Sequence, residues 1–177
     1  MIVVTVGTNE QPFDRLVRAA AALGGDEPLL VQHGASQVPH GRGEWVDFLP
    51  FDVLEARTRG ARVLVCHAGV GSIMLARRCG LRPVVMPRRH HLGEAVDDHQ
   101  LPLAQRLARA GLVTLVEDEA ALAAAVAADA APPVAAIRSQ AGADALTGEV
   151  RSALVALGAT PIAAAPGPIE TPVLGAA

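Results

Sequence analysis

Residues 63–75 read VLVCHAGVGSIML, a short apolar run that ends at a histidine and passes through a glycine-rich turn into a second apolar stretch. The run at 63–66 predicts a buried strand, and the spacing from 72 to 78 predicts a helix that stops at Gly80. A strand joined to a helix by a tight turn is the repeating unit of parallel sheets. This stretch therefore indicates an α/β fold.

Gly69 and Gly71 would let the backbone of this turn bend sharply and approach a ligand closely. We expect Ser72 to cap the helix that follows, whose free N–H groups favour an anion such as phosphate. The spacing is not that of a P-loop, because no Gly-Lys pair follows, and Met74 stands where a GxGxxG motif needs its third glycine. An ordinary strand-to-helix turn without a ligand is the alternative that this stretch leaves open.

Apolar runs of strand length recur along the chain and are separated by stretches with helical periodicity. Strands are expected at 2–6, 29–32, 63–66, 83–86 and 113–116, with a weaker one at 45–48. Helices are expected to start at Pro12 and end near Gly24, to span 53–59 and 72–78, to follow Asp98, and to cover 119–128 and 143–157. Most strands are apolar on both faces, which predicts a doubly wound, mostly parallel sheet with helices on both sides.

The chain of 177 residues is long enough for one domain, which we expect at 1–158, followed by a disordered tail rich in Ala and Pro at 159–177. Its formal net charge is -3, and it has no Lys and no Tyr, so its composition argues against nucleic acid as a partner. Cys66 and Cys79 lack zinc or CxxC spacing and are expected to be reduced thiols of a cytosolic protein. No segment has the length and hydropathy of a membrane span.

Polar loops follow three of the expected strands, at the edge where open parallel sheets bind ligands. In the first, VGTNEQP at 6–12, Gly7 and Thr8 could offer an amide and a hydroxyl to a ligand, or they could only shape the turn. In the second, His67 could donate a hydrogen bond to a phosphate or sugar oxygen, or it could fill the end of the strand.

The third loop, PRRHHLGEAVDDHQ at 87–100, is dense in polar groups: Arg88, Arg89, His90, His91, Glu94, Asp97, Asp98, His99 and Gln100. Mixed donors and acceptors suit sugar hydroxyls, and adjacent arginines suit a diphosphate or a carboxylate. One alternative is a solvated loop in which Asp97 or Asp98 caps the next helix. Another is a metal site of His91, Glu94 and His99, but no HExxH-like spacing is present and no metal is expected. Together the glycine turn and this loop indicate a nucleotide-sugar site.

Three motifs carry a resemblance to a known family: VTVGTNEQPFDRLV at 4–17, CHAGVGSIM at 66–74 and RPVVMPRRHHLGEAVDDHQ at 82–100. Over about its first 150 residues the chain resembles the C-terminal, donor-binding domain of family 28 glycosyltransferases, in the stand-alone bacterial form of exopolysaccharide and capsule synthesis. The resemblance implies a Rossmann-like half of a GT-B fold, with a UDP-sugar across the strand ends and no metal or other cofactor.

The same resemblance assigns roles by position. Gly7 and Thr8 would line the phosphate region and Gly69, Gly71 and Ser72 the diphosphate, with Arg88 and Arg89 nearby, while Asp98 and Gln100 would contact the donor sugar. His67, Glu94 and His99 are the candidates for the general base, which the partner could also supply. Many related transferases have a ribose-binding Glu where this chain has Leu75, so its ribose recognition must differ.

The activity implied is that of a UDP-sugar-dependent hexosyltransferase, which transfers a hexose or uronic acid to a polyprenyl-diphosphate-linked acceptor in exopolysaccharide or glycolipid synthesis. The resemblance also implies a membrane-anchored partner subunit that brings the acceptor, so that a cytoplasmic chain is recruited to the inner face of the membrane. One alternative is a non-catalytic subunit that stabilises a membrane transferase. Another, an NAD-dependent oxidoreductase, is disfavoured by the missing GxGxxG motif.

Overall fold

The structure of this chain, a computed structural model, describes residues 1–128 and the single residues 148 and 152. Apart from these two single residues, the helix expected at 143–157 lies outside the described residues, as do the domain boundary at 158 and the tail at 159–177.

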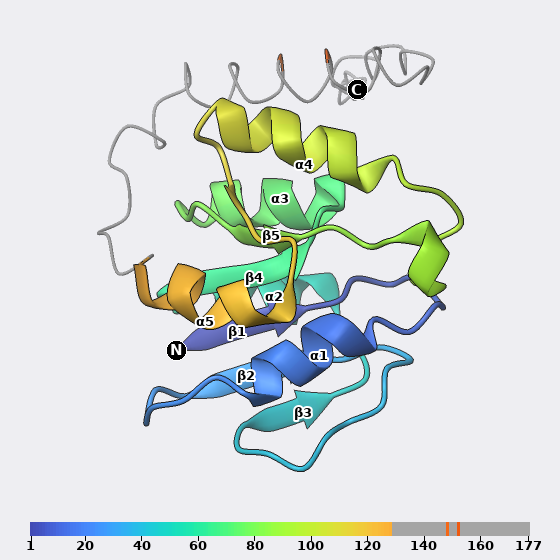
Figure 1. The fold of residues 1–177 in the computed structure, drawn as a ribbon. Coiled ribbons are helices and arrows are strands. Elements are labelled where there is room, and N and C mark those ends of the chain that lie inside the picture. The colour runs from blue at the N-terminus through green and yellow to red at the C-terminus, as the bar shows by residue number, and fades with distance from the viewer. Residues whose placement is uncertain (129–147, 149–151, 153–177) are drawn as a thin grey trace, which may run out of the picture.

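A parallel sheet forms the centre of the molecule (Figure 1). Its strands are β1 (Ile2–Thr5), β2 (Leu29–Gln32), β3 (Glu44–Val46), β4 (Val63–His67), β5 (Val84–Met86) and β6 (Thr114–Leu115). They lie in the order β3-β2-β1-β4-β5-β6, and every neighbouring pair is parallel. The predicted doubly wound α/β fold is confirmed, including the weak strand near Trp45.

The apolar residues of the strands are buried on both faces of the sheet. Along β1, Ile2 and Val4 pack into one hydrophobic cluster and Val3 packs into the other, because successive side chains of a strand point to opposite faces. This double burial explains why the strands are continuous apolar runs and do not alternate with polar residues.

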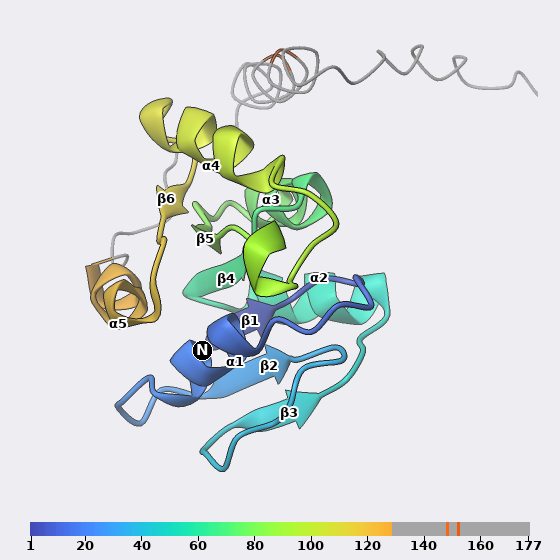
Figure 2. The same cartoon turned by 45° about the vertical axis from the view of Figure 1, so that its right-hand side comes forward.

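Helices cover each face of the sheet. Helices α1 (Asp14–Ala21) and α5 (Glu119–Ala128) pack on the face of Val4, and α2 (Phe51–Arg59), α3 (Val70–Arg78) and α4 (Gln100–Arg109) lie on the other face (Figures 1 and 2). A short 3-10 helix, η1 (His90–Leu92), lies in the loop after β5.

Three helices begin earlier or later than the sequence predicts, and one of them, α2, starts at Phe51 and not at Val53. Helix α1 starts at Asp14, and Pro12 belongs to the preceding loop, because the Phe13 N–H donates to Ser36 Oγ at 2.7 Å and holds the chain off the helical path. Helix α3 starts at Val70, two residues before Ser72, so the glycine turn is shorter than expected.

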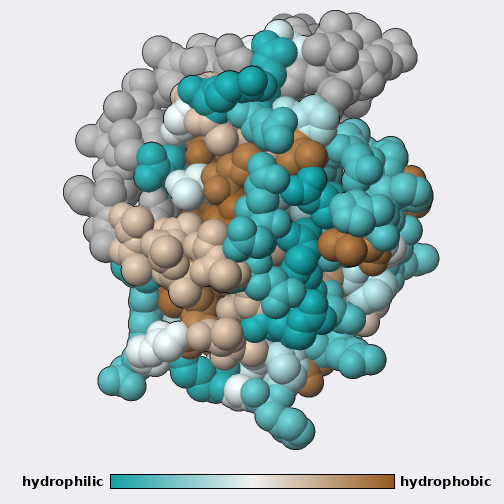
Figure 3. Space-filling model, in the orientation of Figure 1, coloured by the Kyte–Doolittle hydropathy of each residue, from teal (hydrophilic) through white to brown (hydrophobic). Residues whose placement is uncertain are grey.

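The surface of α5 has modest hydropathy because the helix consists mainly of alanine, and Figure 3 shows it in tan. Within the part of the chain that the structure describes, no helix combines the length and the apolar character that a membrane crossing requires.

Candidate functional site

A pocket of about 380 Å³ lies at the carboxyl ends of the central strands. From β1 the chain crosses to β2 on one side, whereas β4 lies on the other side, so the loops after β1 and β4 diverge and leave a crevice. The pocket is lined by Thr5, Gly7, Thr8, Gln32, Phe48, Leu49, Phe51, Leu54, His67, Gly71, Ser72 and Leu75.

His67, the last residue of β4, is wedged between two glycines. A Cβ atom on Gly69 would lie 2.1 Å from His67 Nε2, and one on Gly7 would lie 2.3 Å from His67 Cε1. Gly7 also has a φ of 80°, which non-glycine residues rarely adopt. We expected Gly69 to allow the close approach of a ligand, but the group that approaches it is the His67 imidazole.

The environment of His67 keeps its imidazole neutral. Burial lowers the pKa of His67 to about 4, and the positive charge of Arg88 contributes in the same direction. Its Nδ1 atom is buried and has no hydrogen-bond partner among the described residues. A ring with so low a pKa is a weak general base at neutral pH, but it can still exchange a hydrogen bond with a ligand in the pocket.

The first turn of α3 leaves backbone donors beside the pocket. The first hydrogen bond of this helix runs from the Ile73 N–H to the Gly69 carbonyl at 3.1 Å, so the N–H groups of Val70, Gly71 and Ser72 have no acceptor within the helix. The prediction that Ser72 caps α3 is wrong, because Ser72 is its third residue, and Gly69 occupies the N-cap without a side-chain hydrogen bond.

Gly71 faces open space. A Cβ atom on it would meet no heavy atom within 4 Å, although the residue lies inside a helix, where glycine is unfavourable. No neighbouring protein atom therefore requires a glycine here, and Gly71 is one of the residues that line the pocket.

Two buried polar side chains form the floor of the pocket. Thr5 is 0% exposed and Gln32 is 2% exposed, and the Thr5 hydroxyl donates to Gln32 Oε1 at 3.0 Å. The same hydroxyl accepts a hydrogen bond from the Gly7 N–H at 3.1 Å. Neither residue was predicted to belong to the site, although each is a polar residue that ends an apolar strand at the ligand-binding edge of the sheet.

The opposite wall of the pocket is apolar. Phe48 and Phe51 are exposed around it, and Leu54 and Leu75 lie deeper. The segment between β3 and α2 was not predicted to contribute to the site. The sequence feature that could have indicated this contribution is FLPF at 48–51, which places two of the three phenylalanines of the chain directly after a strand.

Arg88, which was predicted to bind substrate, is fully buried and makes structural contacts. Its guanidinium donates to the carbonyls of Val6, Gln11 and Glu94, each at 2.8 Å, and lies 4.7 Å from the ring centroid of Phe13. Burial lowers the pKa of Arg88 to about 10, so it is charged at neutral pH. We correct the prediction, because all three strong hydrogen bonds are made to the backbone and the side chain does not line the pocket.

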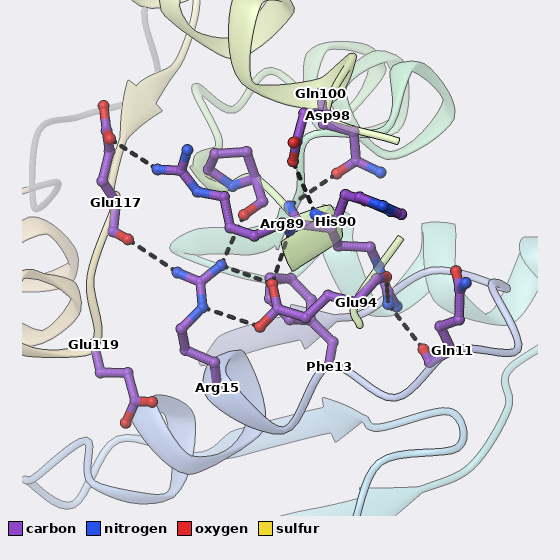
Figure 4. A network of polar contacts seen from close by, with 12 residues as sticks. Gln11, Phe13, Arg15, Arg89, His90, Glu94, Asp98, Gln100, Glu117 and Glu119 are labelled. Carbon is purple, nitrogen blue, oxygen red and sulfur yellow. Dashed lines mark hydrogen bonds and ion pairs between the residues drawn. The ribbon is translucent and has the colours of Figure 1, made fainter. Parts of the chain in front are cut away.

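Glu94, a candidate general base, is held in an ion-pair network outside the pocket (Figure 4). Its carboxylate accepts two hydrogen bonds from Arg15, at 3.0 and 2.9 Å, and one from the Arg89 N–H at 2.9 Å. The Arg89 guanidinium in turn pairs with Glu117 at 2.8 Å. These contacts assign Glu94 a structural role and leave its oxygens engaged.

The remaining candidates of the third loop lie apart from the pocket lining. Asp98 is exposed and accepts a hydrogen bond from the His90 N–H at 2.8 Å, as Figure 4 shows. His99 is also exposed and its Nδ1 contacts Asp97, whose pKa is lowered mainly by a hydrogen bond from the His99 N–H. Gln100 is 8% exposed, and its Oε1 accepts a hydrogen bond from the Arg88 N–H at 3.2 Å.

The structure thus brings together Gly7, Thr8, His67, Gly71 and Ser72 around one pocket, with Gly69 directly behind His67. It does not bring Arg88, Arg89, Glu94, Asp98, His99 or Gln100 to the same lining. Among the described residues, no three His, Cys, Asp or Glu side chains are grouped so that they could hold a metal ion.

The comparisons with known proteins agree with this geometry. Residues 1–150 match the model of the glycosyltransferase family 28 C-terminal domain. No curated protein sequence matches the chain. One similar solved structure is the glycosyltransferase of kitacinnamycin, with 25% identity, a TM-score of 0.52 and coverage of 89% of this chain and 40% of that one.

Two further solved structures share the fold. ALG13 has 17% identity and a TM-score of 0.54, and the match covers 84% of this chain and 94% of that one. The glycosyltransferase VinC, solved in complex with dTDP, has 19% identity, a TM-score of 0.51 and coverage of 89% and 39%. The chain therefore spans about two fifths of the length of two of these relatives and nearly all of the third.

Proposed function

Since the chain belongs to the family of glycosyltransferase family 28 C-terminal domains, we propose that it is the donor-binding subunit of a UDP-sugar-dependent glycosyltransferase. It would transfer a hexose or uronic acid to a polyprenyl-diphosphate-linked acceptor in exopolysaccharide or glycolipid synthesis. The observation that carries this proposal is the pocket lined by Gly71, Ser72 and the neutral His67, beside which the first N–H groups of α3 lack acceptors within the helix.

The diphosphate is proposed to lie against the first turn of α3. The N–H groups of Val70, Gly71 and Ser72 are donors without helical acceptors, and the positive end of the helix dipole favours an anion there. The Ser72 hydroxyl and Thr8 add donors at the rim of the same pocket. In the transfer step, the same donors would stabilise the charge that develops on the leaving nucleoside diphosphate.

The nucleoside is proposed to occupy the apolar side of the pocket. Phe48, Phe51 and Leu54 offer a flat, apolar surface for a base, and Leu75 takes the position where many relatives have a ribose-binding glutamate. Leu75 can pack against the nucleoside but offers no hydrogen bond to the ribose hydroxyls, so these need partners elsewhere. This arrangement supports a nucleotide ligand whose base is held by apolar contacts.

The donor sugar is proposed to extend toward the loop after β5, where the exposed Asp98 and the partly exposed Arg89 are candidates for contact with it. Of the three candidates for the general base only His67 lines the pocket, and its low pKa makes it a weak base. We therefore propose that a membrane-anchored partner subunit supplies both the acceptor and the base, and recruits the cytoplasmic chain to the inner face of the membrane.

Calorimetric titration of the purified chain with UDP tests the nucleotide site directly. UDP is expected to bind, and UMP is expected to bind about tenfold more weakly or worse, because it loses the contacts of the β-phosphate with α3. Titrations with dTDP and ADP measure the selectivity for the base. Absence of binding to every nucleotide and every UDP-sugar, with and without a partner subunit, would sink the proposal.

A second candidate function is a non-catalytic subunit that stabilises a membrane transferase. It is favoured by the engaged carboxylate of Glu94 and by the exposure of His99 outside the pocket, which leave the pocket without a strong base among the described residues. The variant Asp98→Asn separates the two functions, because asparagine keeps an acceptor for the His90 N–H. Loss of turnover in an intact complex supports catalysis, whereas loss of the complex supports a scaffold.

A further inference from the structure

Arg88 fastens both ends of the loop that forms one wall of the pocket. Its Nη2 donates to the carbonyl of Val6, where the loop leaves β1, and its Nη1 donates to the carbonyl of Gln11, where the loop approaches α1. Nη1 also bonds to the carbonyl of Glu94, which ties the loop after β5 to the same guanidinium. A planar guanidinium can meet three carbonyls at once because its donors point in fixed directions.

The segment held between these two bonds includes Gly7 and Thr8, both of which line the pocket. The position of this segment has little freedom, because Gly7 packs against the His67 ring so closely that a Cβ atom would overlap it. A shift of the Val6 carbonyl by a few tenths of an ångström would therefore move the pocket wall. Arg88 itself is absent from the lining of the pocket and is 0% exposed.

We propose that Arg88 is a positioning residue, which sets the affinity for the nucleotide by holding the loop at 7–11 in its binding shape and does not touch the nucleotide. This inference rests on the proposed nucleotide site. It predicts that the geometry of the guanidinium matters as well as its charge, since an ammonium group is a compact point charge that cannot span the three carbonyls.

Arg42 offers a matched control at the opposite end of the sheet. Its guanidinium also binds three backbone carbonyls, those of Leu23, Gly24 and Glu27, in the loop that precedes β2. Arg42→Lys therefore removes the same kind of contact without touching any residue of the pocket.

The test compares UDP affinity, by calorimetry, for the wild type, Arg88→Lys and Arg42→Lys at a temperature where all three are folded. Arg88→Lys is expected to bind UDP about tenfold more weakly or worse, which corresponds to the loss of one charge-assisted hydrogen bond. Arg42→Lys is expected to bind within about twofold of the wild type, whatever its melting temperature, because additivity holds for distant sites. Amide hydrogen exchange at Gly7, whose N–H donates to the Thr5 hydroxyl, should accelerate in Arg88→Lys alone.

The outcomes distinguish failure of the positioning role from failure of the proposed function. If the wild type binds UDP and Arg88→Lys binds it equally well, or if both lysine variants weaken binding equally, the positioning role is overturned. If the wild type binds no nucleotide, the proposed function fails instead. Should Arg88→Lys not fold, Phe13→Leu removes the ring beneath the guanidinium and is expected to weaken UDP binding about threefold, with faster exchange at Gly7. Unchanged affinity and exchange in that variant would overturn the inference.

Discussion

The two ends of the sheet differ in whether their polar groups have partners. At the amino ends of the strands, Glu27 pairs with Arg62 and with the Met1 ammonium, and Arg42 binds three carbonyls. At the carboxyl ends, buried polar atoms such as His67 Nδ1 and Arg88 Nε have no partner among the described residues. A buried polar group without a partner costs free energy, so His67 Nδ1 beside the pocket indicates a ligand-binding end.

The largest effect is expected from a methyl group on Gly7. Gly7→Ala combines a strained positive φ with overlap against His67, and the two costs together should lower the free energy of unfolding by about 3 kcal/mol or more. Chemical denaturation measures this loss. At the amino end, Gly24→Ala is the control, because a Cβ atom there meets nothing within 4 Å.

Gly69→Ala refines the same comparison, because Gly69 has an ordinary φ of -79° and only the overlap remains. Its cost should fall when His67 is also replaced by Ala, so the double variant should lose less stability than the two single losses added together. If the stability losses of the two single variants simply added up in the double variant, the close packing of His67 against the glycines would not constrain the fold.

Acid should destabilise the carboxyl end first. The pKa of His67 is about 4 in the folded chain and about 6.5 when unfolded, so the unfolded state takes up the proton first as the pH falls. Stability should therefore decrease between pH 6.5 and pH 4, by at most about 3 kcal/mol. Urea unfolding at several pH values measures the slope, which should flatten in His67→Asn and persist in His40→Asn, a variant of an exposed histidine.

The amino end should respond in a lower pH window. Hydrogen bonds from Arg62, and then the Met1 ammonium, lower the pKa of Glu27 from 4.5 to about 2, so its contribution is complete above pH 4.5 and is lost as the pH falls toward 2. Because the pair is partly exposed to solvent, we expect about 1 to 2 kcal/mol. Glu27→Gln should remove this loss without changing the slope near pH 5. If His67→Asn and Glu27→Gln changed the loss of stability over the same pH range, the proposed separation of the two ends would be contradicted.

The smallest effect on stability is expected at Gly71, where stability and UDP affinity should change in opposite directions. Alanine favours helix and meets no neighbour there, so Gly71→Ala should raise the free energy of unfolding by about 0.5 kcal/mol. The same methyl group would fill the space proposed for the diphosphate, and UDP affinity should fall about tenfold or more. Tighter or equal binding in a stabilised variant would show that the anion does not lie against α3.

The sequence predicts the fold more completely than it predicts the site. The strands are recognisable because they are apolar on both faces, and the glycines mark the switch point of the sheet. The site depends on which way side chains point, and periodicity does not report this. Arg88 and Arg89 are neighbours of identical type, yet one is fully buried against carbonyls and the other pairs with Glu117 at the surface.

One physical reason explains why several pocket residues could not be predicted from the sequence. Thr5 and Gln32 end apolar strands, and Phe48 and Phe51 both follow a short edge strand, so each resembles an ordinary structural residue when its segment is considered alone. They meet only because the strands are adjacent in the sheet. Ser72 was predicted to cap α3 because its residue type favours that position, but the helix begins at Val70.

The described residues that line the pocket include no Asp, Glu or Arg, and its one histidine is neutral. An anion held there would be bound by dipoles and hydrogen bonds at short range, with no opposite full charge in the lining. Affinity for a nucleoside diphosphate should then change little between low and high ionic strength, since salt screens separated charges far more than direct contacts. A donor site of this kind would keep its occupancy under fluctuating salt and would release the diphosphate product without breaking an ion pair.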